Sequence, residues 1–199
     1  MLKIGIIGAG AIGQAFAKQV TMAGYEVIIS NSRGKESLTD FVKSLKGNIK
    51  AGSVQESAKA DVIFLAVPWK NIPDLTKVVS SWDKIVIDAS NPIIMPGFQI
   101  AELNGKMSSE VVADLLIGAK IVKAFNTLTS ALLASNTNEA GGRRVIFFSG
   151  NDESAKMVVA GIIEKIGFAA VDLGRLNEGG KLMNFPDGPL PTLNLIKLP

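Results

Sequence analysis

The chain has 199 residues and a formal net charge of +3, and 47% of its residues are hydrophobic. It contains neither histidine nor cysteine. Disulfides, Ser-His-Asp and Cys-His nucleophilic sites, and metal or haem sites ligated by histidine or cysteine are therefore excluded. We predict a single well-filled domain, because a chain of this length buries enough apolar surface without covalent crosslinks.

Charge and hydropathy patterning limit the partners. The basic residues are scattered along the chain, which argues against a nucleic-acid-binding surface. The longest uncharged stretch, residues 124–138, is rich in Asn, Thr and Ser, and it is shorter than the roughly 20 apolar residues of a membrane-spanning helix. We expect a cytoplasmic protein without a nucleic-acid or membrane partner.

Segments typical of strands and of helices alternate along the chain. Short apolar runs predict strands at residues 2–7, 26–30, 61–67, 84–89, 120–124, 144–149 and 169–173. Helical spacing of apolar residues predicts helices from residue 11 to a stop at Gly24, and at 36–45, 73–82, 108–116, 129–134 and 152–166. This order predicts an α/β fold with a doubly wound, mostly parallel sheet covered on both faces.

A glycine pattern joins the first strand to the first helix. Gly8, Gly10 and Gly13 form a G-x-G-x-x-G sequence with Ala9, Ala11 and Ile12 between them. In this position the three glycines permit a tight turn, the approach of a pyrophosphate and close helix packing. We therefore predict a Rossmann-type NAD(P)-binding domain over residues 1–184, followed by a C-terminal apolar arm or tail at 185–199. The alternative is a glycine-rich turn that serves packing alone.

The residues after the second strand indicate which dinucleotide binds. An NAD site places Asp or Glu about 20 residues beyond the glycines, whereas this chain has Asn31, Ser32, Arg33 and Lys35 there. A hydroxyl, a guanidinium and an ammonium suit a 2′-phosphate. We predict NADP(H) binding at these residues. The alternative is an ordinary basic surface loop.

Three polar or aromatic sites follow later strands, where ligands of open α/β sheets bind. Trp69 follows the 61–67 strand and is a candidate to stack on the cofactor. Asn91 follows the 84–89 strand and is a candidate to fix a ribose or carboxamide. Asn126 and Thr127 follow the 120–124 strand and are candidates to orient an acceptor. Each also has a simpler interpretation as a core cap, a turn or a helix cap.

The residues that are absent narrow the reaction class. Without histidine, the acid–base site of a 2-hydroxy-acid dehydrogenase cannot be built. The chain's one tyrosine, Tyr25, is followed at the fourth position by Ile29, so the Tyr-x-x-x-Lys pair of short-chain dehydrogenases is also missing. These exclusions favour hydride transfer to a second cofactor that has its own electron sink. Two alternatives are a non-catalytic NADP(H) sensor and a small carbonyl or imine reductase whose proton comes from Lys70, Tyr25, Asp88 or water.

Together these motifs resemble the NADP oxidoreductases dependent on an 8-hydroxy-5-deazaflavin coenzyme, coenzyme F420, and the related reductase domain of the STEAP metalloreductases. The resemblance implies pyrophosphate at Gly8–Gly13, 2′-phosphate at Ser32 and Arg33, and nicotinamide near Val67, Pro68 and Asn91. The matching passages are Ile4–Gly13, Ser30–Arg33, Ala66–Trp69, Lys84–Pro92, Ile121–Thr127, Ser149–Lys156 and Gly167–Leu176.

One residue departs from the deazaflavin enzymes. They carry a histidine where this chain has Asn126, and the Phe-Asn pair is more similar to the STEAP domain. The resemblance implies a deazaflavin coenzyme as the hydride acceptor, and the departure leaves a flavin or another ring open. A homodimer is also implied, and we expect the 185–199 arm to help form it.

Overall fold

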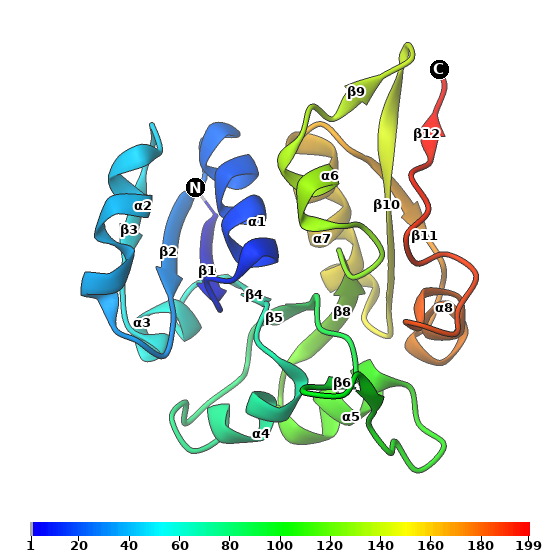
Figure 1. Ribbon diagram of the computed structural model, residues 1–199, viewed down its shortest axis with the longest axis horizontal. Coiled ribbons are helices and arrows are strands. Elements are labelled where there is room, and N and C mark those ends of the chain that lie inside the picture. The colour runs from blue at the N-terminus through cyan, green and yellow to red at the C-terminus, as the bar shows by residue number, and fades with distance from the viewer. Residues whose placement is uncertain (1) are drawn as a thin grey trace.

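One ten-stranded sheet runs through residues 2–199, the part of the chain that this computed structural model describes. Its strand order is β11-β10-β8-β5-β4-β1-β2-β3, with β9 and β12 paired to β10, and β6 and β7 form a separate hairpin (Figure 1). The strands are β1 (Lys3–Ile7), β2 (Glu26–Ser30), β3 (Ile49–Ala51), β4 (Val62–Leu65), β5 (Ile85–Asp88), β6 (Ile93–Ile94), β7 (Gln99–Ile100), β8 (Lys120–Ala124), β9 (Asn138–Glu139), β10 (Gly142–Gly150), β11 (Ala169–Asp172) and β12 (Ile196–Lys197).

The sheet is mostly parallel. From β3 to β8 each neighbouring pair is parallel, with Ile4 of β1 opposite Val27 of β2 and Val62 of β4. β10 reverses direction and pairs antiparallel with β8. Every residue of β4 is buried, as the apolar runs of a two-sided parallel sheet require. The predicted fold class is confirmed, and the carboxyl ends of the parallel strands share one edge.

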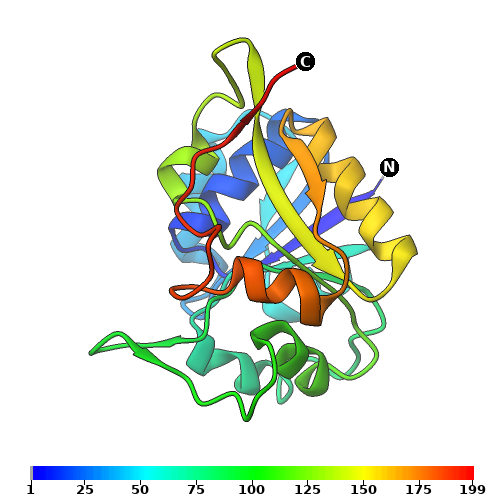
Figure 2. The same ribbon diagram turned by 90° about the vertical axis from the view of Figure 1, so that its right-hand side faces the viewer.

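Helices lie on both faces of this sheet (Figures 1 and 2). One core contains residues of α1 and α7, and a second core on the other face contains residues of α4, α5 and α8. The helices are α1 (Ala11–Met22), α2 (Thr39–Ser44), α3 (Val54–Ala58), α4 (Ile72–Leu75), α5 (Ser108–Leu115), α6 (Ser130–Ala134), α7 (Glu153–Lys165) and α8 (Leu176–Met183), with short 3-10 turns η1 (Lys35–Leu38) and η2 (Trp69–Asn71). None of these described helices is long and apolar enough to cross a bilayer.

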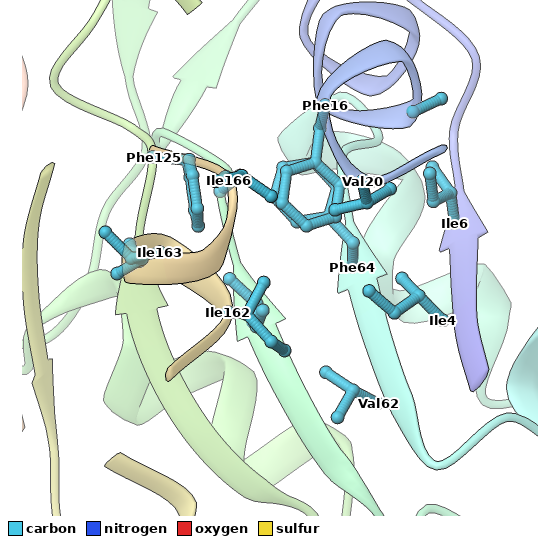
Figure 3. Packing of buried hydrophobic residues seen from close by; sticks show 14 of the residues in the cluster. Ile4, Ile6, Phe16, Val20, Val62, Phe64, Phe125, Ile162, Ile163 and Ile166 are labelled. Atoms are coloured by element: carbon cyan, nitrogen blue, oxygen red, sulfur yellow. The ribbon is translucent and has the colours of Figure 1, made fainter. Parts of the chain in front are cut away.

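Three aromatic rings occupy the centre of the first core (Figure 3). Phe16 of α1 stacks on Phe64 of β4 with ring centroids 3.8 Å apart, and Phe125 meets both rings edge-on at 5.0 and 5.5 Å. All three side chains are fully buried. Phe125 has a left-handed backbone, with φ +66°, a conformation that costs a bulky residue energy and that the surrounding packing must enforce.

Several elements differ from the sequence predictions. The prediction of a helix at 73–82 is wrong beyond Leu75, where α4 ends. The Thr76 hydroxyl donates to the Pro73 carbonyl oxygen (2.8 Å) and competes with the backbone hydrogen bonds that would continue the helix. The segment after it carries the β-branched pair Val78 and Val79, which disfavour helix. The sequence analysis did not identify β3, α3, α8 or the β6–β7 hairpin.

The C-terminal segment packs on its own chain. β12 pairs antiparallel with β10, and the Thr192 backbone N–H donates to the carbonyl of Thr127 at 2.8 Å. Arg144, almost fully buried, donates to Asn194. In Figure 2 this segment runs beside β10 from the end of α8 to the C-terminus. The division of the chain at residue 184 stays a prediction.

Candidate functional site

The glycine turn has three different glycine environments. Gly8 has φ +108°, and a Cβ there would lie 2.2 Å from the carbonyl oxygen of Ala66. At Gly13 a Cβ would lie 1.9 Å from the carbonyl oxygen of Gly8, so this glycine lets α1 pack tightly on the turn. Gly10 has open space around its missing Cβ. The turn is therefore closed towards the protein and open towards solvent at Gly10.

The open side of the turn is the N-terminus of α1. Gly10 is the N-cap residue, no side chain caps it, and the first turn of the helix has no acidic residue. The first backbone N–H groups and the positive end of the helix dipole are thus available to an anion. Ala11 is exposed at this end, and Ile12 is half-buried.

A cleft of about 810 Å³ extends from this turn along the carboxyl edge of the sheet. It brings together eight of the predicted cofactor-binding residues, namely Gly8, Gly10, Asn31, Ser32, Arg33, Lys35, Val67 and Pro68. Its other walls come from the start of α3 and from α4 and the turn that follows it. Ala11, Ile12, Gly13, Trp69 and Asn91 are not part of this lining.

The loop after β2 presents its cations freely. Asn31 turns its side chain into the loop, where its Oδ1 accepts from the Arg33 backbone N–H (2.9 Å) and its Nδ2 donates to Ser37 Oγ (2.9 Å). Ser32, Arg33 and Lys35 are exposed. Within residues 2–199, no ion pair engages either Arg33 or Lys35. Both charges are therefore available to a ligand in the cleft.

Glu56 on the opposite wall of the cleft is occupied by its own helix. Its carboxylate accepts from the Ser53 backbone N–H at 2.8 Å, which completes a capping box. This bond is the main reason that the pKa of Glu56 is lowered, and the charges of Lys50 and Lys35 add to the effect. Sequence analysis did not identify this wall, because α3 is short and its five residues show no clear helical period.

A second, smaller cavity of about 260 Å³ opens at the same edge of the sheet. It brings together Asn91, Asn126 and Thr127, which follow β5 and β8. Ile12 in the first turn of α1 also lines it, and Gly10, the N-cap residue of the same helix, lines the larger cleft, so both cavities border the N-terminus of α1. The remaining walls are Ala89, Phe125, Leu128, Thr129, Ser130, Phe185 and Thr192.

Two side-chain amides join the strand ends at this cavity. Asn126 Nδ2 donates to Asn91 Oδ1 (3.0 Å) and to the Met183 carbonyl oxygen (2.8 Å), and Asn91 Nδ2 donates to the Asn126 carbonyl oxygen (3.3 Å). Asn126 is 7% exposed, and its Oδ1 has no partner among the described residues. The bonds to two acceptors fix the orientation of this amide and attach the end of α8 to the site.

A buried ionic network lies beneath the amides. Asp88 and Lys123 are opposite one another on β5 and β8, with Oδ2 and Nζ 3.2 Å apart. The Asp88 carboxylate accepts from the backbone N–H and hydroxyl of Ser90 (2.9 and 2.6 Å) and from Ser109 Oγ (2.5 Å). Lys123 Nζ donates to the Ser90 carbonyl oxygen (2.5 Å) and Ser108 Oγ (3.2 Å). The network holds the backbone directly before Asn91.

Comparison with protein families finds a match in the first part of the chain. The model of the family described as NADP oxidoreductase, coenzyme F420-dependent, matches residues 3–92, which include the glycine turn, the Arg33 loop and Asn91. The match covers slightly less than half of the chain. The resemblance found in the motifs is confirmed.

Individual relatives extend the similarity beyond residue 92. The structure of a hypothetical protein from Sinorhizobium meliloti is 45% identical, with a TM-score of 0.93 over 99% of this chain and 96% of that one. A proposed F420-dependent NADP reductase from Arthrobacter sp. FB24 is 25% identical, with a TM-score of 0.77 over 92% and 90% of the two chains. Mouse and human metalloreductase STEAP2 are 26% identical over 192 residues, and the match spans 92% of this chain but only 35% of theirs.

The remaining candidates, Trp69, Lys70 and Tyr25, line neither cavity. Trp69 is half-buried and packs against the second core, and Lys70 beside it is exposed. Tyr25 precedes β2 at the opposite edge of the sheet, where Lys165 Nζ lies 4.2 Å from its ring centroid and burial raises the pKa of its phenol. The predicted stacking role of Trp69 stays a prediction.

Phe185 is the residue of the small cavity that sequence reasoning missed. It belongs to the 185–199 segment, which the sequence marks only by its prolines and apolar residues. Its place in the cavity depends on contacts with residues near 126, about 60 positions earlier, and no local pattern signals such contacts.

Proposed function

We propose that this protein is an NADP-dependent oxidoreductase that transfers a hydride from NADPH to a deazaflavin or flavin ring. The observation that carries the proposal is the pair of cavities that border the N-terminus of α1, the larger one at Gly10 and the smaller one at Ile12. The larger one has the size and cations for a dinucleotide, whereas the smaller one, at about 260 Å³, suits one ring system better than a whole dinucleotide. The described lining of the smaller cavity contains amides, hydroxyls and apolar groups but no carboxylate, amine or phenol.

The chain's own groups fit the diphosphate and 2′-phosphate of NADP(H). Gly10 leaves space where a side chain would block the approach of the diphosphate to the helix N-terminus. Arg33 and Lys35, together with the Ser32 hydroxyl, provide donors for the 2′-phosphate. A charge-assisted hydrogen bond contributes about 1.5–3 kcal/mol, so Arg33 alone would favour NADP over NAD roughly tenfold to a hundredfold.

The chemical end lies where the two cavities approach one another. Val67 and Pro68 line the larger cavity after β4, and Ala89 and Asn91 follow the adjacent strand β5. We assign the nicotinamide to this boundary and the acceptor ring to the smaller cavity. When bound, NADPH supplies the hydride and the acceptor ring its own electron sink. The residues of the chain hold the rings in register, and apolar walls such as Leu128 exclude water.

A carbonyl or imine reductase fits the site less well, because such a reaction needs a proton donor near the substrate. Asp88 is fully buried and its carboxylate is held by Ser90, Ser109 and Lys123. Tyr25 and Lys70 line neither cavity. Water is then the one donor of the four candidates that can reach the site. The absence of titratable side chains from the described lining of the smaller cavity supports a ring acceptor.

The proposed function is tested by following NADPH oxidation with a deazaflavin coenzyme, FMN, ferric chelates and a panel of carbonyl compounds. We expect turnover with the ring acceptors. Kd values for NADPH and NADH would be compared between the wild type, Arg33→Ala and the control Lys43→Ala, an exposed lysine of α2 outside the cleft. Arg33→Ala should weaken NADPH binding at least tenfold and leave NADH binding unchanged.

Other outcomes of this test have definite meanings. An unchanged NADPH/NADH preference in Arg33→Ala would remove the 2′-phosphate assignment. Tight NADPH binding without turnover of any acceptor would refute hydride transfer and leave the NADP(H) sensor. The homodimer that the resemblance implies and the cytoplasmic location expected from the hydropathy pattern stay predictions.

A further inference from the structure

Residues 184–192, which we call the strap, form a loop with both ends attached to the same turn. Before the strap, the Met183 carbonyl oxygen accepts from Asn126 Nδ2 at 2.8 Å. At its far end, the Thr192 backbone N–H donates to the Thr127 carbonyl oxygen, also at 2.8 Å. Asn126 and Thr127 are neighbours in the wall of the small cavity. The strap is therefore fixed at the rim of this cavity.

The strap is also closed internally. The Gly188 backbone N–H donates to the Asn184 carbonyl oxygen at 2.6 Å, and that of Leu190 donates to Leu182 at 3.1 Å. A Cβ at Gly188 would lie 2.6 Å from the carbonyl oxygens of both Leu182 and Asn184. These backbone bonds hold the strap as a compact loop, so the side chains that it contributes to the cavity, Phe185 and Thr192, have defined positions.

The ring of Phe185 is supported from outside by the β6–β7 hairpin. Phe98, between the two strands of the hairpin, meets it edge-on with centroids 5.8 Å apart and the ring planes at 80°. Phe98 is 53% exposed and has a left-handed backbone, with φ +51°. Apart from the contact with Phe185, no aromatic pair engages Phe98 within the described chain. An exposed aromatic residue in a strained turn is thus placed against a cavity wall.

We infer that Phe185 is the aromatic wall against which the acceptor ring packs, and that Phe98 is a positioning residue that acts through Phe185. This inference rests on the proposed function. Planar conjugated rings bind aromatic side chains by stacking or edge contact, and this preference does not depend on hydrogen bonds. The amides of Asn91 and Asn126 also line this cavity. The ring of Phe185 would select for a planar ring rather than for a small carbonyl compound.

The test compares KM for FMN and for a deazaflavin coenzyme with Kd for NADPH in Phe185→Ala, Phe185→Leu and Phe98→Ala. The control is Ile117→Ala, which removes an apolar residue that is 81% exposed beyond α5 and lines neither cavity. Phe185→Ala should raise KM for ring acceptors roughly tenfold. Phe185→Leu should fall between Phe185→Ala and wild type, and Phe98→Ala should raise KM by a smaller factor.

Two further measurements separate a binding role from a structural one. Kd for NADPH and the melting temperature should stay near wild type in all four variants. Phe98→Ala should have no additional effect on KM in the Phe185→Ala background, because Phe98 acts through that ring. If Phe185→Ala leaves acceptor KM within twofold of wild type, or raises Kd for NADPH by the same factor, the inference is wrong. A wild-type protein that binds NADPH but reduces no ring compound would instead refute the proposed function, and this inference with it.

Discussion

Replacing Lys123 by methionine would leave the Asp88 carboxylate buried without its counter-charge. Breaking a buried ion pair by removing one partner costs about 3–5 kcal/mol, against a total of roughly 5–15 kcal/mol for a domain. Here Asp88 would keep three hydrogen bonds, from the backbone and hydroxyl of Ser90 and from Ser109. It would also keep the favourable N-terminus of α5, where Ser109 lies. We therefore expect a loss near 3 kcal/mol, at the lower end of that range.

The reverse substitution, Asp88→Asn, should be more damaging. Lys123 would keep the Ser90 carbonyl oxygen and the Ser108 hydroxyl, but its ammonium would face the positive end of the α5 dipole without a negative partner. We expect a loss near 5 kcal/mol. The double variant Asp88→Asn/Lys123→Met should cost less than the sum of the two single changes by about 2 kcal/mol or more, because neither charge is then left alone.

Urea unfolding followed by circular dichroism measures all three free energies, and equal slopes against urea confirm that the same transition is observed. Additive losses in the double variant would refute the reasoning, since they would show that the two charges do not depend on each other. A smaller loss for Asp88→Asn than for Lys123→Met would refute the role assigned to the α5 dipole.

Two other predictions concern the glycine turn and pH. Gly13→Ala should lower the melting temperature, because its Cβ would overlap a backbone oxygen. Gly10→Ala should keep the melting temperature and weaken NADPH binding. Equal effects of the two substitutions on stability would contradict this prediction. The pKa of Asp152 lies well below its usual 3.8, first because of its hydrogen bond from Ser154 and then because of Lys120. A carboxyl group whose pKa is lower in the folded than in the unfolded protein stabilises the fold at pH values above its unfolded-state pKa. This stabilisation decreases as the pH falls from the unfolded-state pKa towards the folded-state pKa. Asp152→Asn should therefore melt below wild type at pH 7, and the difference in melting temperature should begin to shrink as the pH falls below about 4; a constant difference would count against this.

The sequence was sufficient for the elements whose signal is local. The strands predicted at 26–30 and 120–124 have the same limits in the structure, since an apolar run between polar turns defines both ends. The glycine pattern and the polar residues after β2 likewise placed six predicted cofactor-binding residues along one cleft. Short-range patterns predict such features because the edge of a parallel sheet collects whatever follows each strand.

Features that depend on distant contacts were not predictable in this way. α8 contains Gly179 and Gly180, which weaken helix propensity, yet Gly179 is needed because a Cβ there would lie 2.6 Å from the Cβ of Ser149. Phe185 enters the small cavity through bonds to residues about 60 positions away. The sequence shows neither the close approach of α8 to β10 nor the closure of the strap, because both arise from tertiary packing.

Phe125 belongs both to the first hydrophobic core and to the lining of the small cavity. Its ring packs edge-on against the stacked rings of Phe16 and Phe64, and its left-handed backbone turns the chain so that Asn126 reaches the small cavity. The position of the Asn126 amide therefore depends on the packing of these three aromatic rings. A substitution at Phe16 or Phe64, whose side chains line neither cavity, is therefore expected to move the Asn126 amide and to change the binding of the acceptor ring proposed above.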